Sequence, residues 1–278
     1  MEQYVLTKSG FTLYINDTPG DKGTIIAVHG LTGNHKQFHH YQKAFTGTYR
    51  FVSYDLRGRG NSDPAAKETS IYTHVEDLIE LIEFLNIKRP ILMGYSMGAY
   101  ICAIAASKLF NVEALILLDG AGEADDTSRK LVIPSLTRLH KEFQSMDKYV
   151  EEMKVLYTNL QVSWTETMEK IVQYDLQRTV NGWIHKSDPV LIEQDFESFY
   201  TFTPEIVCSH ITSETLLFIA TGRIGDKAPL FRKDGYEKTK RYIRHLKTHE
   251  IHINHYELVF NIQPTINRGI SRFLEEVK

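Results

Sequence analysis

Residues 94–98 read Gly94-Tyr95-Ser96-Met97-Gly98, between an apolar run at residues 90–93 and a run of mostly small side chains at residues 99–107. A serine in a sharp turn between a strand and a helix has a strained backbone, so its neighbours need little or no side chain. The two glycines meet that need. The stretch therefore predicts a strand, a tight turn and a helix, with the Ser96 hydroxyl above the sheet edge as a nucleophile.

A second glycine-containing stretch, His29-Gly30-Leu31-Thr32-Gly33, follows another apolar run at residues 24–28. Glycines allow a backbone to approach a ligand closely with its amides pointing inward. The Leu31 amide and the Met97 amide, which begins the predicted helix, together predict an oxyanion hole. His29 itself is interpreted as a structural loop residue.

The first half of the chain alternates strand-like and helix-like segments. Its short apolar runs suit strands that are buried on both faces of a parallel sheet: residues 24–28, 51–54, 91–93 and 114–118. Residues 71–85 carry an amphipathic helical stripe. This alternation predicts a parallel sheet with right-handed helical crossovers. Residues 3–6 and 12–15 predict a hairpin at a sheet edge.

The pattern changes between residues 123 and 212, where helical stretches replace buried strands: residues 133–143, 146–156, 165–177 and 189–199. A strand (215–220), a helix (236–246), a strand (249–253) and a helix (265–276) then follow. We predict a core domain of residues 1–121 and 213–278, interrupted by a helical cap of residues 122–212.

The cap is rich in aromatic residues, and ligand pockets are lined mainly by apolar and aromatic groups. Trp183, beside Gly182 in a predicted interhelical turn, is predicted to face the substrate. The cap is also mildly acidic, which disfavours a strongly anionic substrate.

The order of the motifs HGLTG, DLRGRGNSD, GYSMG and LLDG, followed by a cap and a late histidine, resembles the α/β-hydrolase superfamily. The resemblance covers residues 20–120 and 213–278. It implies an α/β fold whose eight-stranded, mostly parallel sheet is flanked by helices, with the cap inserted after the sixth strand. It also implies the chain order nucleophile, acid, histidine.

The resemblance places the acid after strand 215–220, where Asp226 stands in Gly222-Arg223-Ile224-Gly225-Asp226. Three residues separate Gly222 from Asp226, whereas many relatives have two. Asp119, at the end of the preceding strand, is the rival, since some relatives carry the acid there. Its alternative interpretation is a loop or helix-capping residue.

For the base, the resemblance favours His255, which follows the last predicted strand. His252 is the next candidate, but it and His249 lie within that strand. Relatives usually have glycine before this histidine, and here Asn254 stands there. Asparagine tolerates a left-handed backbone better than other non-glycine residues, so the turn is expected to survive.

Together these residues predict a serine hydrolase that cleaves a carboxylic ester or related acyl compound through an acyl-enzyme, with the triad Ser96, Asp226 and His255. The same fold could also serve a C–C hydrolase or lyase, a lactonase, an amidase, a perhydrolase or a non-catalytic ligand-binding receptor. Serine at position 96 argues against dehalogenases and epoxide hydrolases, whose nucleophile there is aspartate.

No metal or organic cofactor is predicted. His35 and His39 have a spacing that can hold zinc on a helix, but no glutamate of the zinc-protease type lies between them and no third ligand is evident. They are interpreted as solvated or pocket-rim residues. Cys102 and Cys208 give no disulfide framework, so both are interpreted as reduced core thiols.

The net charge of −3 argues against a nucleic-acid partner. No apolar segment approaches the roughly 20 residues that span a bilayer, and the first residues lack the features of a secretory signal. The expected partner is a small-molecule acyl substrate, without nucleic acid or membrane, and the expected location is the cytoplasm.

Overall fold

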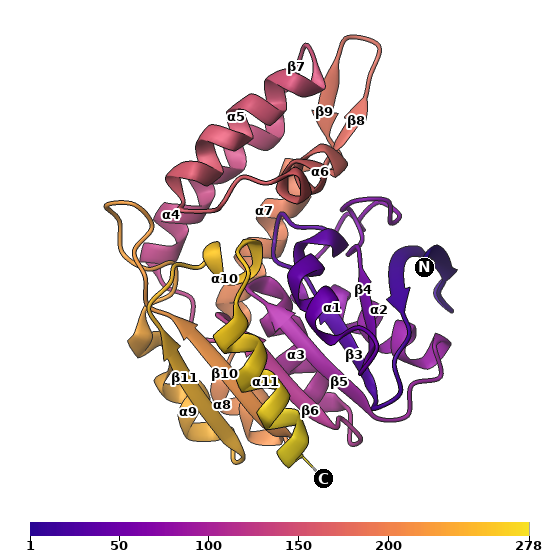
Figure 1. The fold of residues 1–278 in the computed structure, drawn as a ribbon, viewed down its shortest axis with the longest axis vertical. Coiled ribbons are helices and arrows are strands. Elements are labelled where there is room, and N and C mark those ends of the chain that lie inside the picture. Colours follow the sequence, from indigo (N-terminus) through magenta and orange to yellow (C-terminus); the bar gives the residue numbers. More distant parts are fainter. Residues whose placement is uncertain (278) are drawn as a thin grey trace.

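The computed structural model describes residues 1–277 and contains a central sheet of eight strands: β1 (Glu2–Leu6), β2 (Thr12–Thr18), β3 (Thr24–Val28), β4 (Arg50–Tyr54), β5 (Pro90–Tyr95), β6 (Ala114–Leu118), β10 (Glu214–Ala220) and β11 (Leu246–Ile251) (Figure 1). Their order is β1-β2-β4-β3-β5-β6-β10-β11. β1 and β2 form the predicted edge hairpin, β2 is also antiparallel to β4, and every other pair is parallel. The predicted mostly parallel sheet is confirmed.

Helices cover both faces of this sheet (Figure 1). One face packs against α1 (His39–Phe45), α10 (Glu257–Phe260) and α11 (Pro264–Glu276), and the other against α2 (Ile71–Phe84), α3 (Met97–Lys108) and α9 (Glu237–Tyr242). Ile25 and Ala27 of β3 enter the first core, whereas Ile26 and Val28 enter the second. Because both faces are buried, the strand reads as a continuous apolar run. None of the helices in residues 1–277 has the length and apolar character needed to cross a bilayer.

The segment between β6 and β10 forms most of a cap above the carboxyl ends of the strands (Figure 1). It contains α4 (Asp126–Leu136), the 3-10 helix η2 (Thr137–His140), β7 (Glu142–Phe143), α5 (Met146–Asn159), α6 (Glu166–Tyr174), β8 (Leu176–Arg178), β9 (Trp183–His185), α7 (Pro189–Glu197) and η3 (Ser198–Thr201). The three short strands form an antiparallel sheet in the order β7-β9-β8. The sequence patterns did not predict these strands, because each has only two or three residues.

Several boundaries differ from the prediction: the helix expected at residues 236–246 is the shorter α9 (Glu237–Tyr242), and the strand expected at residues 249–253 is β11 (Leu246–Ile251). The expected helix 133–143 is instead α4, which begins seven residues earlier because the Asp125 carboxylate caps it by accepting a hydrogen bond from the Ser128 amide. At the other end of the insertion, α8 (Pro204–Val207) and η4 (Cys208–His210) pack against α3 and α9. Residues 204–210 therefore belong to the helical layer of the core rather than to the cap.

A buried carboxylate ties the cap to the core. Asp195 of α7 lies 2.6 Å from an Arg59 guanidinium nitrogen, and it accepts hydrogen bonds from Thr69 Oγ1 at 2.7 Å and from His74 Nε2 at 3.0 Å. Asp195 and Arg59 are almost completely inaccessible to solvent. Burial alone would raise the pKa of the Asp195 carboxyl, but the charges of Arg59 and His74 lower it.

Replacing Asp195 by alanine is expected to lower the free energy of unfolding by about 3–5 kcal/mol, because it leaves the buried Arg59 charge without its partner. Urea unfolding followed by circular dichroism measures the change. Glu193→Ala is the matched control: this side chain is exposed on the same helix, and the expected change is within about 0.5 kcal/mol. Equal effects of the two substitutions would contradict the importance of the buried pair.

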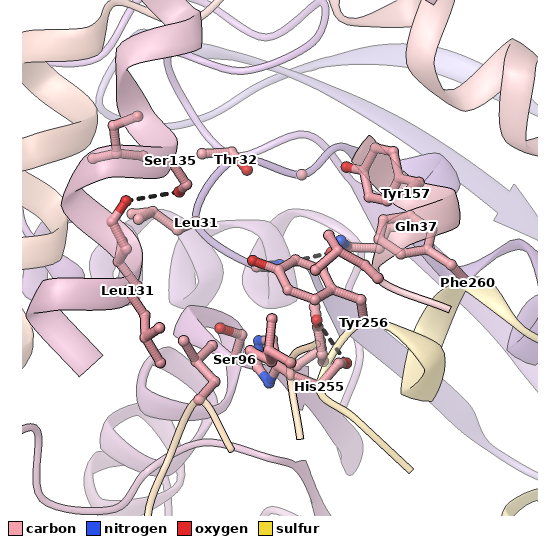
Figure 2. A pocket seen from close by; sticks show the side chains of 18 of the residues that line it. Leu31, Thr32, Gln37, Ser96, Leu131, Ser135, Tyr157, His255, Tyr256 and Phe260 are labelled. Carbon is pink, nitrogen blue, oxygen red and sulfur yellow. Dashed lines mark hydrogen bonds between the residues drawn. The ribbon is translucent and has the colours of Figure 1, made fainter. Parts of the chain in front are cut away.

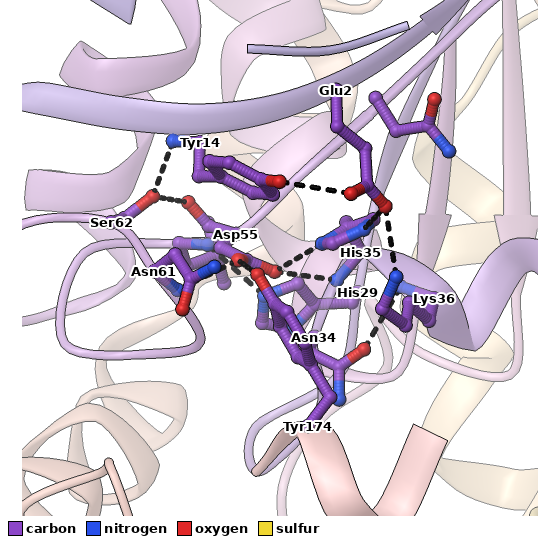
Figure 3. A network of polar contacts seen from close by, with 12 residues as sticks. Glu2, Tyr14, His29, Asn34, His35, Lys36, Asp55, Asn61, Ser62 and Tyr174 are labelled. Atoms are coloured by element: carbon purple, nitrogen blue, oxygen red, sulfur yellow. Dashed lines mark hydrogen bonds and ion pairs between the residues drawn. The ribbon is translucent and has the colours of Figure 1, made fainter. Parts of the chain in front are cut away.

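A second buried carboxylate, Asp55, also connects the cap to the core, and here the carboxylate belongs to the core and its donor to the cap (Figure 3). It accepts hydrogen bonds from the His35 amide at 2.7 Å, from His35 Nδ1 at 2.9 Å and from the Tyr174 hydroxyl of α6 at 2.6 Å. The interpretation of His35 as a solvated or rim residue is therefore wrong. His35 is buried in a structural network, which Glu2 extends to the surface.

Candidate active site

Ser96 occupies the predicted turn between β5 and α3. Its φ of 53° and ψ of −119° are strained for a residue with a side chain. The glycines on either side are required by close approach: a Cβ at Gly98 would lie 1.9 Å from the Val28 carbonyl oxygen, and one at Gly94 would lie 2.2 Å from the Gly98 carbonyl oxygen. The GxSxG pattern is thus a steric condition for this turn.

His255 follows β11 and lies beside Ser96 in one cavity (Figure 2). Its Nδ1 donates a hydrogen bond to Asp119 Oδ2 at 2.7 Å, which leaves Nε2 as the nitrogen available to a serine proton. The imidazole stacks on the Tyr95 ring with centroids 4.7 Å apart, and the Tyr95 hydroxyl donates to the His255 carbonyl at 3.0 Å. These contacts fix the position of the ring.

Asp119 is the carboxylate of this site, at the end of β6. It is completely buried, and its Oδ1 accepts hydrogen bonds from the Ala220 amide at 3.1 Å and from the Tyr236 hydroxyl at 2.9 Å. Its two oxygens thus have different partners, and only Oδ2 faces His255. The two donors on Oδ1 hold the carboxylate in place.

The prediction of Asp226 as the partner of His255 is wrong. Asp226 is exposed, in a loop where Ile224 and Lys227 form an isolated antiparallel bridge and Gly225 has a φ of +57°. The extra residue between Gly222 and Asp226 allows this tight turn, which carries the Asp226 side chain to the surface. The rival at position 119 takes the place beside the histidine.

Asn254 plays a different part from the one expected. Its φ is not positive, and its side-chain oxygen accepts hydrogen bonds from the amides of Tyr256 at 2.9 Å and Glu257 at 3.1 Å. Its Nδ2 donates to the Leu160 carbonyl in the cap at 2.9 Å. Asn254 therefore stabilises the turn that carries His255 through its side chain and not through a left-handed backbone.

The loop after β3 is held rigidly by His29. The Leu56 amide donates to His29 Nε2 at 3.0 Å, so the ring proton is on Nδ1, which donates to the Gly30 carbonyl at 2.7 Å. Burial lowers the pKa of His29 to about 3, so the ring is neutral at pH 7. The Gly30 carbonyl and the Leu31 amide share one peptide plane, and this hydrogen bond therefore orients that amide. The interpretation of His29 as a structural residue is confirmed.

Arg59 fixes the next peptide of the loop, because its Nε donates to the Leu31 carbonyl at 3.1 Å. Within residues 1–277, neither the Leu31 amide nor the Met97 amide donates to another backbone or side-chain group. The Met97 amide begins α3, where the helix dipole favours negative charge. Their joint action as an oxyanion hole stays a prediction.

The cavity around Ser96 has a volume of about 330 Å³ and lies between the core and the cap (Figure 2). Its lining is mostly apolar and includes Leu31, Leu131, Tyr157, Phe199, Phe231, Tyr256 and Phe260. From the sequence, only the richness of the cap in aromatic residues indicated that some cap side chains line a pocket. This signal did not distinguish side chains that line the cavity from those that pack against the core.

The prediction that Trp183 faces the substrate is wrong. It does not line the cavity; it lies in β9, in the short sheet at the far end of the cap (Figure 1). Gly182 and Trp183 belong to the hairpin between β8 and β9, not to an interhelical turn. Arg138 and Asp175, which the sequence patterns did not single out, do line the cavity.

Comparison with known proteins identifies one family. The protein-family model described as alpha/beta hydrolase fold matches residues 23–257 of the chain. Among curated proteins, the chain is 34% identical over 127 residues to the AB hydrolase superfamily protein YisY of Bacillus subtilis, which is 45% of this chain and 47% of that protein. It is 29% identical over 148 residues to an sn-1-specific diacylglycerol lipase of Danio rerio, and the match covers 52% of this chain and 42% of that protein. The matches thus span less than half the length of these two relatives.

Solved structures resemble the chain along its whole length. E-2-(acetamidomethylene)succinate hydrolase has a TM-score of 0.86 at 18% identity, with 99% of each chain covered. The enol-lactonase from Burkholderia xenovorans LB400 has a TM-score of 0.74 at 16% identity, with 99% of this chain and all of that chain covered. At these identities the likeness shows the fold.

Proposed function

The chain belongs to the α/β hydrolase fold family, and from this premise we propose that it is a serine hydrolase that cleaves a carboxylic ester or a related acyl compound. One observation carries the proposal. The Asp119–His255 hydrogen bond of 2.7 Å orients an imidazole whose Nε2 has no hydrogen-bond partner within residues 1–277, beside a serine on a strained turn in the cavity between core and cap. This arrangement is the one that activates a serine hydroxyl for attack on an acyl carbon.

In the proposed reaction, His255 Nε2 takes the proton of the Ser96 hydroxyl as the oxygen attacks the carbonyl carbon. The imidazolium then gives this proton to the leaving alcohol, and the acyl group remains on Ser96. Water, deprotonated by the same nitrogen, hydrolyses the acyl-enzyme. Asp119 keeps the Nδ1 proton in place and stabilises the imidazolium, while the Leu31 and Met97 amides would bind the oxyanion.

The names of two similar structures support testing bonds other than simple esters. One is an E-2-(acetamidomethylene)succinate hydrolase and the other an enol-lactonase. An amide and a lactone therefore belong in the substrate panel. The same panel distinguishes a hydrolase from a ligand-binding protein of this fold, because the latter would turn over none of its members.

The 4-nitrophenyl esters from acetate to dodecanoate test the proposal. Short and medium chains are expected to be hydrolysed, with kcat/KM for butyrate about 10-fold or more above that for dodecanoate, because a cavity of about 330 Å³ is near the lower limit of ligand pockets. Release of nitrophenol measures the rates. Inertness towards every ester, lactone and amide, together with no labelling by a fluorophosphonate, would favour the ligand-binding protein.

A further inference from the structure

Arg138 of η2 brings a positive charge into the cavity that contains Ser96. Its guanidinium donates to the Ser135 carbonyl and, at 2.9 Å, to the Thr32 hydroxyl. Both acceptors are neutral. A guanidinium has five N–H donors, so these contacts orient Arg138 and leave donors for a ligand.

Within residues 1–277, the other arginines that are buried or half-buried each form an ion pair with a carboxylate of the protein. Arg57 lies 2.7 Å from Asp77, Arg59 2.6 Å from Asp195 and Arg50 2.7 Å from Asp17. Arg138 forms no ion pair with a carboxylate of the described residues. Removing a charged group from water costs free energy unless a group of opposite charge binds it. For Arg138, a negatively charged group of a ligand in the cavity could take this place.

One carboxylate, Asp175, lines the same cavity, but its charge is weakened and already engaged. Asn34 Nδ2 donates to it at 2.8 Å. Burial raises the pKa of Asp175 to about 7, against the lowering influence of Asn34, Arg138 and Lys186, and the nearby Asp55 charge raises it further. His185, which also faces Asp175, is kept neutral because burial lowers its pKa to about 3. Near neutral pH, Asp175 therefore cancels the Arg138 charge only in part.

Lys227, on the loop after β10, is the other cationic side chain of the lining, so cations outnumber acids there. The acidic balance of the cap lies elsewhere. Its glutamates include Glu151, Glu152 and Glu166, which are exposed and paired with lysines. The net charge of the cap is thus a poor guide to the charge that a substrate meets.

We propose that Arg138 binds a carboxylate of the substrate, so that the preferred substrates are acyl compounds that carry a carboxylate in addition to the bond that Ser96 attacks. The planar fork of arginine matches a carboxylate with two parallel hydrogen bonds. Thr32, which holds the guanidinium, is adjacent in the chain to Leu31, so the carboxylate site lies next to the oxyanion loop. This inference rests on the proposed function for its substrate class, but the binding site can be tested without turnover.

The kinetic test compares 4-nitrophenyl valerate with the mono-4-nitrophenyl ester of glutaric acid, which has a carboxylate at the end of a chain of similar length. The natural protein is expected to prefer the glutarate ester by about 10-fold or more in kcat/KM. Arg138→Gln should lower kcat/KM for the glutarate ester by about 30-fold and change that for valerate less than 3-fold, as expected for loss of charged hydrogen bonds. Arg178→Gln, an exposed arginine of β8, is the matched control and should change neither value.

The binding test measures the thermal midpoint with glutarate and, at equal ionic strength, with chloride. Glutarate should raise the midpoint of the natural protein and of Arg178→Gln but not of Arg138→Gln. Equal loss of both ester activities in Arg138→Gln, or a midpoint shift that survives the substitution, would overturn the carboxylate site. If neither ester is hydrolysed, the wider substrate panel and the fluorophosphonate decide on the proposed function, and the midpoint shift still decides whether Arg138 binds a carboxylate.

Discussion

Replacement of Ser96 by alanine is expected to reduce kcat on 4-nitrophenyl butyrate by about 10⁶-fold, since removal of a nucleophilic serine costs about this much in hydrolases with such a triad. Alanine has no oxygen to form the acyl-enzyme, and a water attacking directly would lack the position that the turn gives to the Ser96 hydroxyl. The fold should persist, because the hydroxyl makes no hydrogen bond that caps α3. Initial rates and the thermal midpoint measure the two effects.

Ser107→Ala is the matched control for this substitution. Ser107 lies on the same helix, where its hydroxyl donates to the Ile104 carbonyl at 2.7 Å, away from the cavity. The initial rate of the Ser107→Ala variant on 4-nitrophenyl butyrate should stay within about twofold of that of the natural protein. A Ser96→Ala variant that keeps more than a hundredth of the activity would show that another group performs the attack.

Replacement of Asp119 by asparagine is expected to lower kcat by about 10⁴-fold, as the loss of the correct histidine tautomer does in a serine protease. Oδ1 of Asp119 accepts from the Ala220 amide and the Tyr236 hydroxyl, so the amide oxygen of an asparagine would stay on that side. Its NH₂ group would then face His255 Nδ1 and force that nitrogen to accept. The ring proton would move to Nε2, which could no longer take the serine proton.

Asp226→Asn provides the comparison for this second prediction. The side chain is exposed and outside the cavity lining, so kcat should change less than twofold. Steady-state kinetics of the two variants on one ester decides between the carboxylates. A large loss in Asp226→Asn with a small loss in Asp119→Asn would restore the assignment that the resemblance first implied.

The sequence was sufficient for the turn at Ser96 and for most strands of the sheet, although the last strand begins three residues earlier than predicted. Gly94 is required by a contact within the turn itself, and Gly98 by a contact with β3, which lies beside β5 in the sheet. The strands were recognisable because burial on both faces makes their apolar runs continuous. His255 was placed correctly in space because it follows the last strand at the edge where Ser96 projects.

The choice of acid could not be made from the sequence. Asp119 and Asp226 follow β6 and β10, which are neighbours in the sheet with Leu118 opposite Phe218. Both carboxylates therefore start close to the same edge. The decision depends on the turn at Gly225 and on the hydrogen bond from Tyr236, which is 117 residues from Asp119.

The cap was the least predictable part. Its helices follow local signals, but the strands at Glu142–Phe143 and Trp183–His185 pair over about 40 residues of sequence and are too short for a periodic pattern. Which cap side chains enter the cavity depends on how these elements pack on the core. Arg138 faces the cavity because its contact with Thr32 spans the two domains.

The central claim is that His255 activates the Ser96 hydroxyl, and covalent labelling tests it most directly. The protein is treated with a fluorophosphonate, and peptide mass spectrometry locates and quantifies the adduct in the natural protein and in His255→Ala. We predict one adduct, on Ser96, formed at least 100-fold more slowly in the variant. An adduct on another residue, or equal labelling rates in the two proteins, would contradict the claim.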